Sequence, residues 1–191
     1  TAKHLMPRIF DNITDRLLPA LQETLALCER GDFCVGYFNL RGWRQLHDYV
    51  EKWPGGEGIC CRLLVGMQTL PSDVLREALS LSTTPNQMDN ATALRLKRNL
   101  AEEFRDELCI GTPTEDDEKG LRRLAQQIKA KKVIVKLYVK HQLHAKLYLL
   151  FRPDPINPIT GFLGSSNLTL AGLSRQGELN IDVLDHDATR K

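Results

Sequence analysis

The chain has 191 residues, which predicts a single domain over 1–191, because compact domains usually contain roughly 100–200 residues. Hydrophobic residues make up 42% of the chain and charged residues 26%, a composition that excludes collagen-like, low-complexity and largely disordered proteins. The formal net charge of +2 is too small for a histone-like polybasic binder. No apolar run reaches the roughly 18–20 residues of a membrane span, so we expect a soluble protein with no membrane partner.

The five cysteines indicate a reducing compartment rather than a disulfide framework. Their number is odd, and the neighbours Cys60 and Cys61 would point to opposite faces of a strand. The other three, Cys28, Cys34 and Cys109, show no C-x-x-C spacing, so neither a zinc site nor a thioredoxin-type site is indicated. We therefore expect buried thiols and a cytoplasmic protein.

Helices and strands alternate over the first two thirds of the chain. Apolar residues at helical spacing predict helices over 9–28, 43–53, 72–81, 90–109 and 121–128. Short apolar runs bounded by turn residues predict buried strands over 33–38 and 59–67. The stretch 111–117 is either a loop or the lead-in to a helix.

The last third is rich in strands. Four β-rich runs follow one another, over 133–139, 145–151, 161–163 and 179–184. Alternating helices and strands followed by clustered strands predict an α/β domain with a mixed central β-sheet flanked by helices on both faces. No internal repeat divides the chain in two.

Polar side chains gather at the ends of the predicted C-terminal strands. The segment H-A-K (144–146) starts one strand, and the two-residue period puts His144 and Lys146 on the same face. The segment G-S-S-N (164–167) ends the next strand, where Ser165 and Asn167 share a face. A helix starting near residue 168 would add backbone donors for an anion. Glu178 heads the last strand, so four kinds of polar group converge.

These five side chains suit phosphoryl transfer. The neutral imidazole of His144 can attack phosphorus. Lys146, Ser165 and Asn167 can hold the non-bridging oxygens and stabilise the charge that gathers there. Glu178 can bond the second ring nitrogen of His144 and fix its tautomer. A phosphohistidine intermediate needs no metal, so we expect a metal-independent site with no cofactor.

This series resembles the phospholipase D superfamily, whose motifs are H-x-K followed by G-S-x-N. Both motifs occur here in that order, and the glutamate eleven positions after Asn167 resembles the arrangement in the metal-independent nuclease branch. The resemblance implies a phospholipase D/nuclease-like fold and a phosphodiesterase. The family motif has an aspartate where this chain has Phe151, a departure common in the nuclease-like branch. Which group takes over the structural role of that aspartate stays open.

A second resemblance lies nearer the N-terminus. The run G-Y-F-N-L-R-G-W (36–43), after the first predicted helix, is similar to phospholipase D-like modules at the N-termini of bacterial superfamily II helicases. It implies that the chain is the N-terminal part of a longer helicase-type or restriction-type protein. ATP would then bind only to motor domains that follow.

A single H-x-K motif occurs in the chain. Members of the superfamily use two half-sites, because one histidine attacks while the other protonates the leaving oxygen. The resemblance therefore implies an isologous homodimer with the two His144 side chains facing each other across the two-fold axis. His144 would be the nucleophile in one subunit and the general acid in the other.

Three interpretations of function stay open. The first is a nuclease acting on DNA or RNA, whose backbone would follow a basic track of Arg122, Arg123, Lys129, Lys131, Lys132, Lys136 and Lys140. Taken singly, each of these cations fits a solvated helix end or strand edge better. The second is a catalytically silent nucleic-acid-binding and dimerisation module, which Phe151 and the modest charge favour. The third is a phospholipid phosphodiesterase, which the lack of a basic amphipathic helix disfavours.

Overall fold

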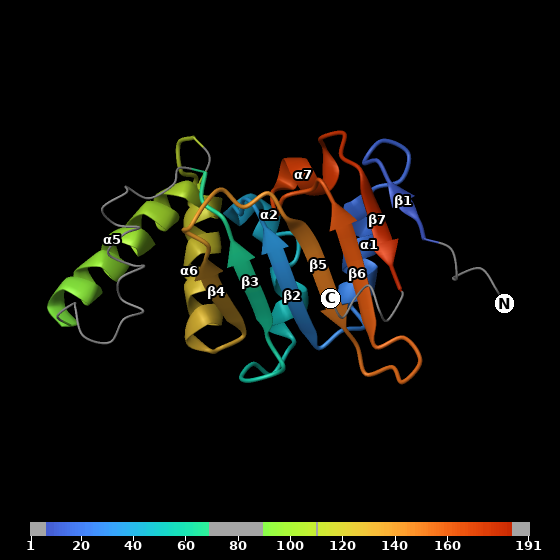
Figure 1. Cartoon of the computed structure of the whole chain (residues 1–191), viewed down its shortest axis with the longest axis horizontal. Helices are drawn as coiled ribbons and strands as arrows, with labels where there is room; N and C mark the ends of the chain where they lie inside the picture. The colour runs from blue at the N-terminus through green and yellow to red at the C-terminus, as the bar shows by residue number, and fades with distance from the viewer. Residues whose placement is uncertain (1–6, 69–89, 110, 185–191) are drawn as a thin grey trace.

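The structure, a computed structural model, describes residues 7–68, 90–109 and 111–184. Seven strands form one sheet in the order β1-β7-β6-β5-β2-β3-β4 (Figure 1). Their bounds are β1 Ile9–Phe10, β2 Arg30–Val35, β3 Cys61–Val65, β4 Val133–Leu137, β5 Lys146–Phe151, β6 Ile159–Gly164 and β7 Asn180–Val183. Strands β2, β3 and β4 run parallel, whereas β5, β6, β7 and β1 join antiparallel. The predicted mixed sheet of an α/β fold is thus confirmed.

The helices are α1 Leu17–Leu25, α2 Leu40–Trp43, α3 His47–Glu51, α5 Asn90–Glu107, α6 Glu115–Lys129 and α7 Leu170–Ser174. Five of them form one connected layer, in which α1 contacts α3 and α7 while α2 contacts α6 and α7. Helix α5 projects at the end of the molecule beyond β4 (Figure 1). None of the helices in the described residues is long and apolar enough to cross a membrane.

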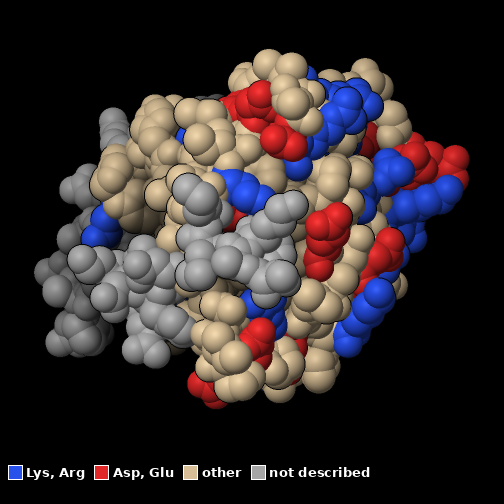
Figure 2. All heavy atoms as spheres, turned by 90° about the vertical axis from the view of Figure 1, so that its right-hand side faces the viewer, with Lys and Arg blue, Asp and Glu red and all other residues tan. Residues whose placement is uncertain are grey.

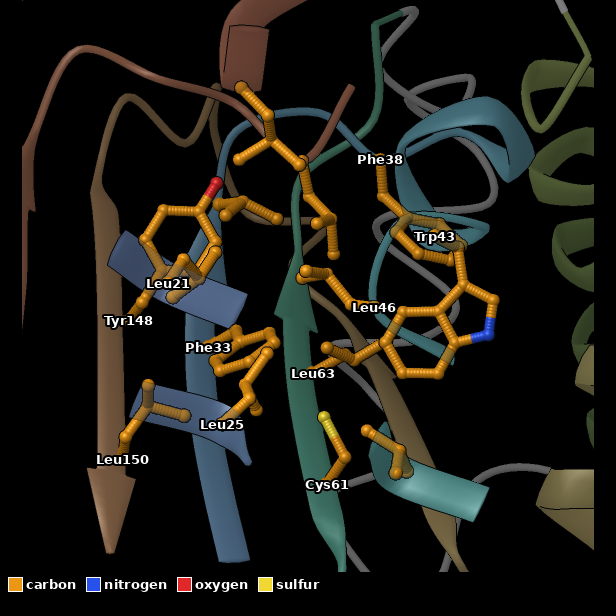
Figure 3. Close-up of a cluster of buried hydrophobic side chains, with 14 of the residues drawn as sticks. Leu21, Leu25, Phe33, Phe38, Trp43, Leu46, Cys61, Leu63, Tyr148 and Leu150 are labelled. Carbon is orange, nitrogen blue, oxygen red and sulfur yellow. The ribbon is translucent and has the colours of Figure 1, made fainter. Parts of the chain in front are cut away.

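The core lies between this helical layer and one face of the sheet. Alternate residues of the strands are buried there, such as Phe33 on β2 and Leu63 on β3. Figure 3 shows Phe33 and Tyr148 from neighbouring strands beside Leu21 of α1, with Trp43 at the far side of the cluster. The ring centroids of Phe33 and Tyr148 lie 5.1 Å apart in an edge-on arrangement.

The opposite face of the sheet stays partly open. Leu163 on β6 is 50% exposed there, and Arg62 pairs with Asp32 across β3 and β2. An ion-paired surface of this kind does not favour an apolar helix above it. The sequence predicts helices on both faces of the sheet, whereas the described helices cover one face. The helix predicted over 72–81 lies outside the described residues.

The helix predicted over 9–28 begins too early. Ile9 and Phe10 instead form β1 and pair with β7. The Asp11 side chain accepts hydrogen bonds from the backbone N–H groups of residues 13, 14 and 15, and Asn12 has a φ of 59°. Because this side chain competes with helical hydrogen bonding, a turn separates β1 from α1.

Two further segments differ in detail from expectation. Of the helix predicted over 43–53, only residues 47–51 form a helix of their own, α3; Trp43 ends α2, and a turn over 44–46 separates the two. The stretch 111–117 leads into α6: Thr114 caps it and exchanges side-chain hydrogen bonds with Asp117 in a capping box. All five cysteines are free, of which Cys34 and Cys109 are half-buried rather than buried.

Candidate active site

The sheet topology brings the predicted site segments to one end of the sheet. Strand β5 is antiparallel to β2, so Lys146 at its start pairs with Val35 at the end of β2. Strand β6 ends at Gly164, which pairs with Asn180 at the start of β7. The H-A-K segment, the G-S-S-N segment and Glu178 therefore all lie at the same ends of the strands, beside α7 at the top of Figure 1.

The G-S-S-N segment is locked by buried hydrogen bonds at its second serine. Ser166 is fully buried; its backbone N–H donates to Asn180 Oδ1 at 3.3 Å, and Asn180 Nδ2 donates to Ser166 Oγ at 2.8 Å. The Tyr148 hydroxyl donates to the Ser166 carbonyl at 2.8 Å. Since Ser166 faces inward, Ser165 and Asn167 on either side of it face outward.

Glycine at position 164 is required by a close approach. A Cβ added there would lie 2.2 Å from the carbonyl oxygen of Leu179 and 2.5 Å from Asn180 Oδ1. The packing of β6 against the start of β7 therefore requires the glycine of the motif.

Asn167 is oriented by the run G-Y-F-N-L-R-G-W. Its Oδ1 accepts a hydrogen bond from the backbone N–H of Tyr37 at 3.0 Å. A backbone N–H only donates, so the amide oxygen is committed and the Asn167 NH₂ group remains as a donor. Phe38 and Leu168 form a parallel bridge beside this contact. The two segments that carry the family resemblances therefore form one structural unit.

The backbone of Leu143, just before His144, lies close to Gly36. A Cβ on Gly36 would lie 2.3 Å from the carbonyl oxygen of Leu143 and 3.3 Å from Asn167 Oδ1. Gly66, after β3, is similarly close, because its Cβ would lie 2.9 Å from the Leu143 side chain. Glycines at the ends of β2 and β3 thus let the H-A-K segment approach the G-S-S-N segment.

A hollow of about 360 Å³ lies beside α7. Its walls include Asn167 and Glu178 of the predicted site, together with Tyr37, Arg41 and Arg175. The structure thus brings Asn167 and Glu178 together. Sequence reasoning missed the two arginines: Arg41 lies in the run G-Y-F-N-L-R-G-W, which indicates a resemblance but no chemistry, and Arg175 lies outside every motif.

The other three predicted residues lie apart from this hollow. His144 is exposed, and Lys146 Nζ donates to the His144 backbone carbonyl at 2.7 Å. Ser165 Oγ accepts from the N–H of Leu179 at 3.0 Å. Within the described residues, no hydrogen bond joins the His144 ring to Glu178, and none of these three side chains lines the hollow.

Over residues 7–68, 90–109 and 111–184, no three His, Cys, Asp or Glu side chains are grouped as metal ligands would be. His141, three residues before His144, instead lies edge-on to the Tyr138 ring at 4.9 Å between centroids.

Phe151 occupies the position of the family aspartate at the other end of β5. Five residues of strand place it about 17 Å from Lys146. The Arg30 guanidinium lies 4.2 Å from the Phe151 ring centroid and pairs with Asp32 at 2.6 Å. Phe151 therefore lies in an apolar and ion-paired cluster at the end of β5 that is remote from His144.

Three of the seven cations of the predicted basic track form ion pairs with acids. Arg122 and Arg123 form ion pairs with Glu118 and Asp48, and Lys132 Nζ lies 2.7 Å from Glu51. These cations lie on α6 and around β4, and β3 and β2 separate β4 from β5 in the sheet. On the face that carries β1 and β7, Lys and Arg are interspersed with Asp and Glu (Figure 2). Among the described residues, the face that carries β1 and β7 therefore shows no continuous basic path.

The comparisons with known proteins find similarity in structure alone. No family model matches the chain, and a search of curated proteins by sequence found no match. NucT from Helicobacter pylori is similar with a TM-score of 0.50 and 12% identity, over 97% of this chain and 89% of that chain. A mutant of yeast tyrosyl-DNA phosphodiesterase 1 has a TM-score of 0.49 and 10% identity, over 93% of this chain and 32% of that chain. The chain therefore shares the overall fold of NucT.

Proposed function

We propose that the chain is a phosphodiesterase that cleaves DNA or RNA without a metal, through a phosphohistidine intermediate. The observation that carries this proposal is the hollow in which Glu178 lies beside Asn167, whose NH₂ group is left as a donor by the Tyr37 contact. The likeness in fold to NucT supports the class of enzyme. Activity depends on the side chains at the site rather than on the fold.

In the proposed reaction, a ring nitrogen of His144 attacks phosphorus and the bond from phosphorus to the leaving oxygen breaks. The histidine of a second copy donates a proton to that oxygen; it then takes a proton from the water that attacks the phosphohistidine, so that the bond from nitrogen to phosphorus breaks and both histidines are restored. Lys146, Ser165 and Asn167 bind the non-bridging oxygens. The flexible lysine stem allows Nζ to leave its bond to the His144 carbonyl when phosphate arrives.

A catalytically silent module that binds nucleic acid is the second candidate. It is favoured by the contacts of the single chain, in which Glu178 makes no hydrogen bond to His144 within the described residues and Lys146 is engaged by a backbone carbonyl. Such a module keeps the anion-binding donors and lacks an activated nucleophile.

Cleavage in EDTA separates these candidates. The wild-type chain should cleave a plasmid or a single-stranded oligonucleotide in EDTA, and His144→Ala should lower the rate by about 10³-fold or more. His141→Ala is the matched control, because His141 is also exposed and lies three residues away. No cleavage by the wild type would reject the nuclease. Nucleic-acid binding that survives His144→Ala without any cleavage would support the silent module.

The proposal includes a homodimer that shares the site, in a cytoplasmic protein of helicase or restriction type. Sedimentation of the chain at the concentration of the cleavage assay should show a dimer. A monomer that cleaves at full rate would contradict the shared site. Turnover of phosphatidylcholine vesicles with indifference to DNA would instead indicate a phospholipid substrate.

A further inference from the structure

We propose that Arg41 and Arg175 bind a second phosphate of the nucleic-acid strand, next to the phosphate that is cleaved. This inference rests on the proposed function and names a substrate-binding element that the motifs do not contain. It predicts that the site prefers a strand with several phosphates over a simple phosphodiester.

Both arginines line the hollow that contains Asn167 and Glu178. Arg41 lies on α2, whereas Arg175 is the residue that ends α7, and these two helices are in contact. A guanidinium offers donors in a planar fork that matches a phosphate group. Two such groups from separate elements can therefore bind one phosphate together.

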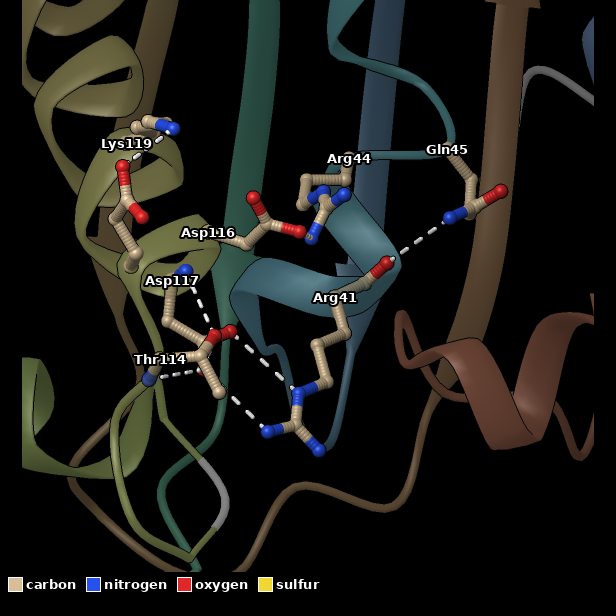
Figure 4. Close-up of polar contacts among 8 residues, drawn as sticks. Arg41, Arg44, Gln45, Thr114, Asp116, Asp117 and Lys119 are labelled. Carbon is tan, nitrogen blue, oxygen red and sulfur yellow. Dashed lines mark hydrogen bonds and ion pairs between the residues drawn. The ribbon is translucent and has the colours of Figure 1, made fainter.

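Arg41 is held in place by a buried acid. Its Nε and one terminal nitrogen lie 3.5 and 3.4 Å from the carboxylate of Asp117, whose residue is 1% exposed (Figure 4). Burial would raise the pKa of Asp117, but hydrogen bonds from Thr114 and Arg41 outweigh it and keep the pKa below the ordinary aspartate value. The ionised carboxylate therefore positions the Arg41 guanidinium at the hollow.

Arg175 is the less constrained member of the pair. It is exposed, and its guanidinium forms no ion pair with any residue of 7–68, 90–109 or 111–184. The acidic wall of the hollow is Glu178; Asp11, next to it through the backbone, turns its carboxylate to its own loop amides. Asp117 offsets the charge of Arg41 and Glu178 that of Arg175, so the hollow attracts an anion through the N–H donors of the two guanidinium groups rather than through net charge.

The adjacent phosphate is the anion that fits this arrangement. In the proposed reaction the Asn167 NH₂ group serves the cleaved phosphate, so a further anion-binding pair in the same hollow meets the next group along the strand. A mononucleotide diester lacks that group. The contribution of the arginines should therefore depend on the length of the substrate.

Arg175→Gln and Arg41→Gln test this with two substrates and one control. The control is Arg44→Gln, because Arg44 follows on from α2, pairs with Asp116 at 3.1 Å and does not line the hollow. Side chains of Arg41 and Arg44 are 37% and 41% exposed, so the two substitutions are matched in burial. Arg175→Gln leaves no buried acid unpaired and keeps the test valid if Arg41→Gln unfolds.

For a single-stranded DNA 12-mer, each hollow variant should raise KM about tenfold and lower the slope of log affinity against log salt by about 0.7. Cleavage of bis(p-nitrophenyl) phosphate should stay at the wild-type rate, and Arg44→Gln should match the wild type throughout. An equal loss on both substrates, or an unchanged salt slope in DNA binding, would overturn the inference. Absence of all cleavage by the wild type would reject the proposed function instead, while the salt slope still decides whether the arginines bind the strand.

Discussion

The two motif segments of the candidate site are held in opposite ways. The G-S-S-N segment is pinned from within, through Ser166, Asn180 and Tyr148, and from outside by the backbone of Tyr37. The H-A-K segment is exposed at His144, whose carbonyl accepts from Lys146. Preorganised donors stabilise transition-state charge without reorganisation, so rigidity suits a phosphate-binding segment. In the proposed dimer, by contrast, the His144 side chain must stay accessible until the two subunits meet.

This difference predicts a graded response to substitution. Polar groups that are buried with their partners are costly to leave unpaired, whereas an exposed side chain without partners contributes little to stability. Substitutions that disturb the G-S-S-N segment should therefore lower the stability of the fold. Substitution of His144 should lower catalysis and leave stability nearly unchanged. The four changes below run from the largest expected effect on stability to the smallest.

Gly164→Ala should destabilise the fold by about 3 kcal/mol or more, because its Cβ would clash with backbone oxygen and with Asn180. Urea unfolding measures the change. Gly120→Ala on α6 is the control, since the nearest heavy atom to its Cβ lies 3.8 Å away. That variant should gain up to about 1 kcal/mol from helix propensity. Equal stability of the two variants would show that the approach of β6 to β7 is loose.

Asn180→Leu should cost about 2 kcal/mol in unfolding free energy, because Ser166 loses the partners of its buried N–H and hydroxyl groups. The double variant with Ser166→Ala removes the hydroxyl as well and should recover part of the loss. A double-mutant cycle by urea unfolding measures this coupling. Strictly additive changes in unfolding free energy would contradict the coupling of Asn180 and Ser166 through these hydrogen bonds.

Tyr148→Phe should cost about 1 kcal/mol near neutral pH, through loss of the hydrogen bond to the Ser166 carbonyl. Burial, and to a smaller degree the charge of Glu178, raises the pKa of Tyr148. The unfolded chain releases this proton above the ordinary tyrosine pKa of about 10 while the folded chain keeps it, so stability falls as pH rises there.

Unfolding free energies at pH 9 and at pH 11 measure that alkaline loss. The wild type should lose up to about 1.4 kcal/mol per pH unit more than Tyr148→Phe in the upper part of this window. Parallel profiles for the two proteins would mean that the Tyr148 hydroxyl titrates as in the unfolded chain.

His144→Ala should change the unfolding free energy by no more than about 0.5 kcal/mol, although the proposed reaction loses its nucleophile. Thermal or urea unfolding beside the cleavage assay measures both quantities on one sample. A large loss of stability would place the imidazole among the packed residues and would remove the contrast between the two segments.

Local patterns in the chain predict much of the fold. Short apolar runs predict β2 to β7 to within a few residues, and the helical stripes predict α1, α5 and the C-terminal part of α6. These are properties of near neighbours in sequence. Local patterns do not predict the strand of Ile9 and Phe10, because this strand exists only through pairing with β7, which lies far along the chain.

The site divides in the same manner. The spacing of H-x-K, G-S-x-N and Glu178, read together with strand period, is sufficient to place these segments at one end of a sheet. The packing of α2 and α7 brings Asn167 to Tyr37, 130 positions away, and places Arg41 and Arg175 in the walls of one hollow. Hydrogen bonds and charges act over a few ångströms in space, and local periodicity carries no information on which distant segments come that close.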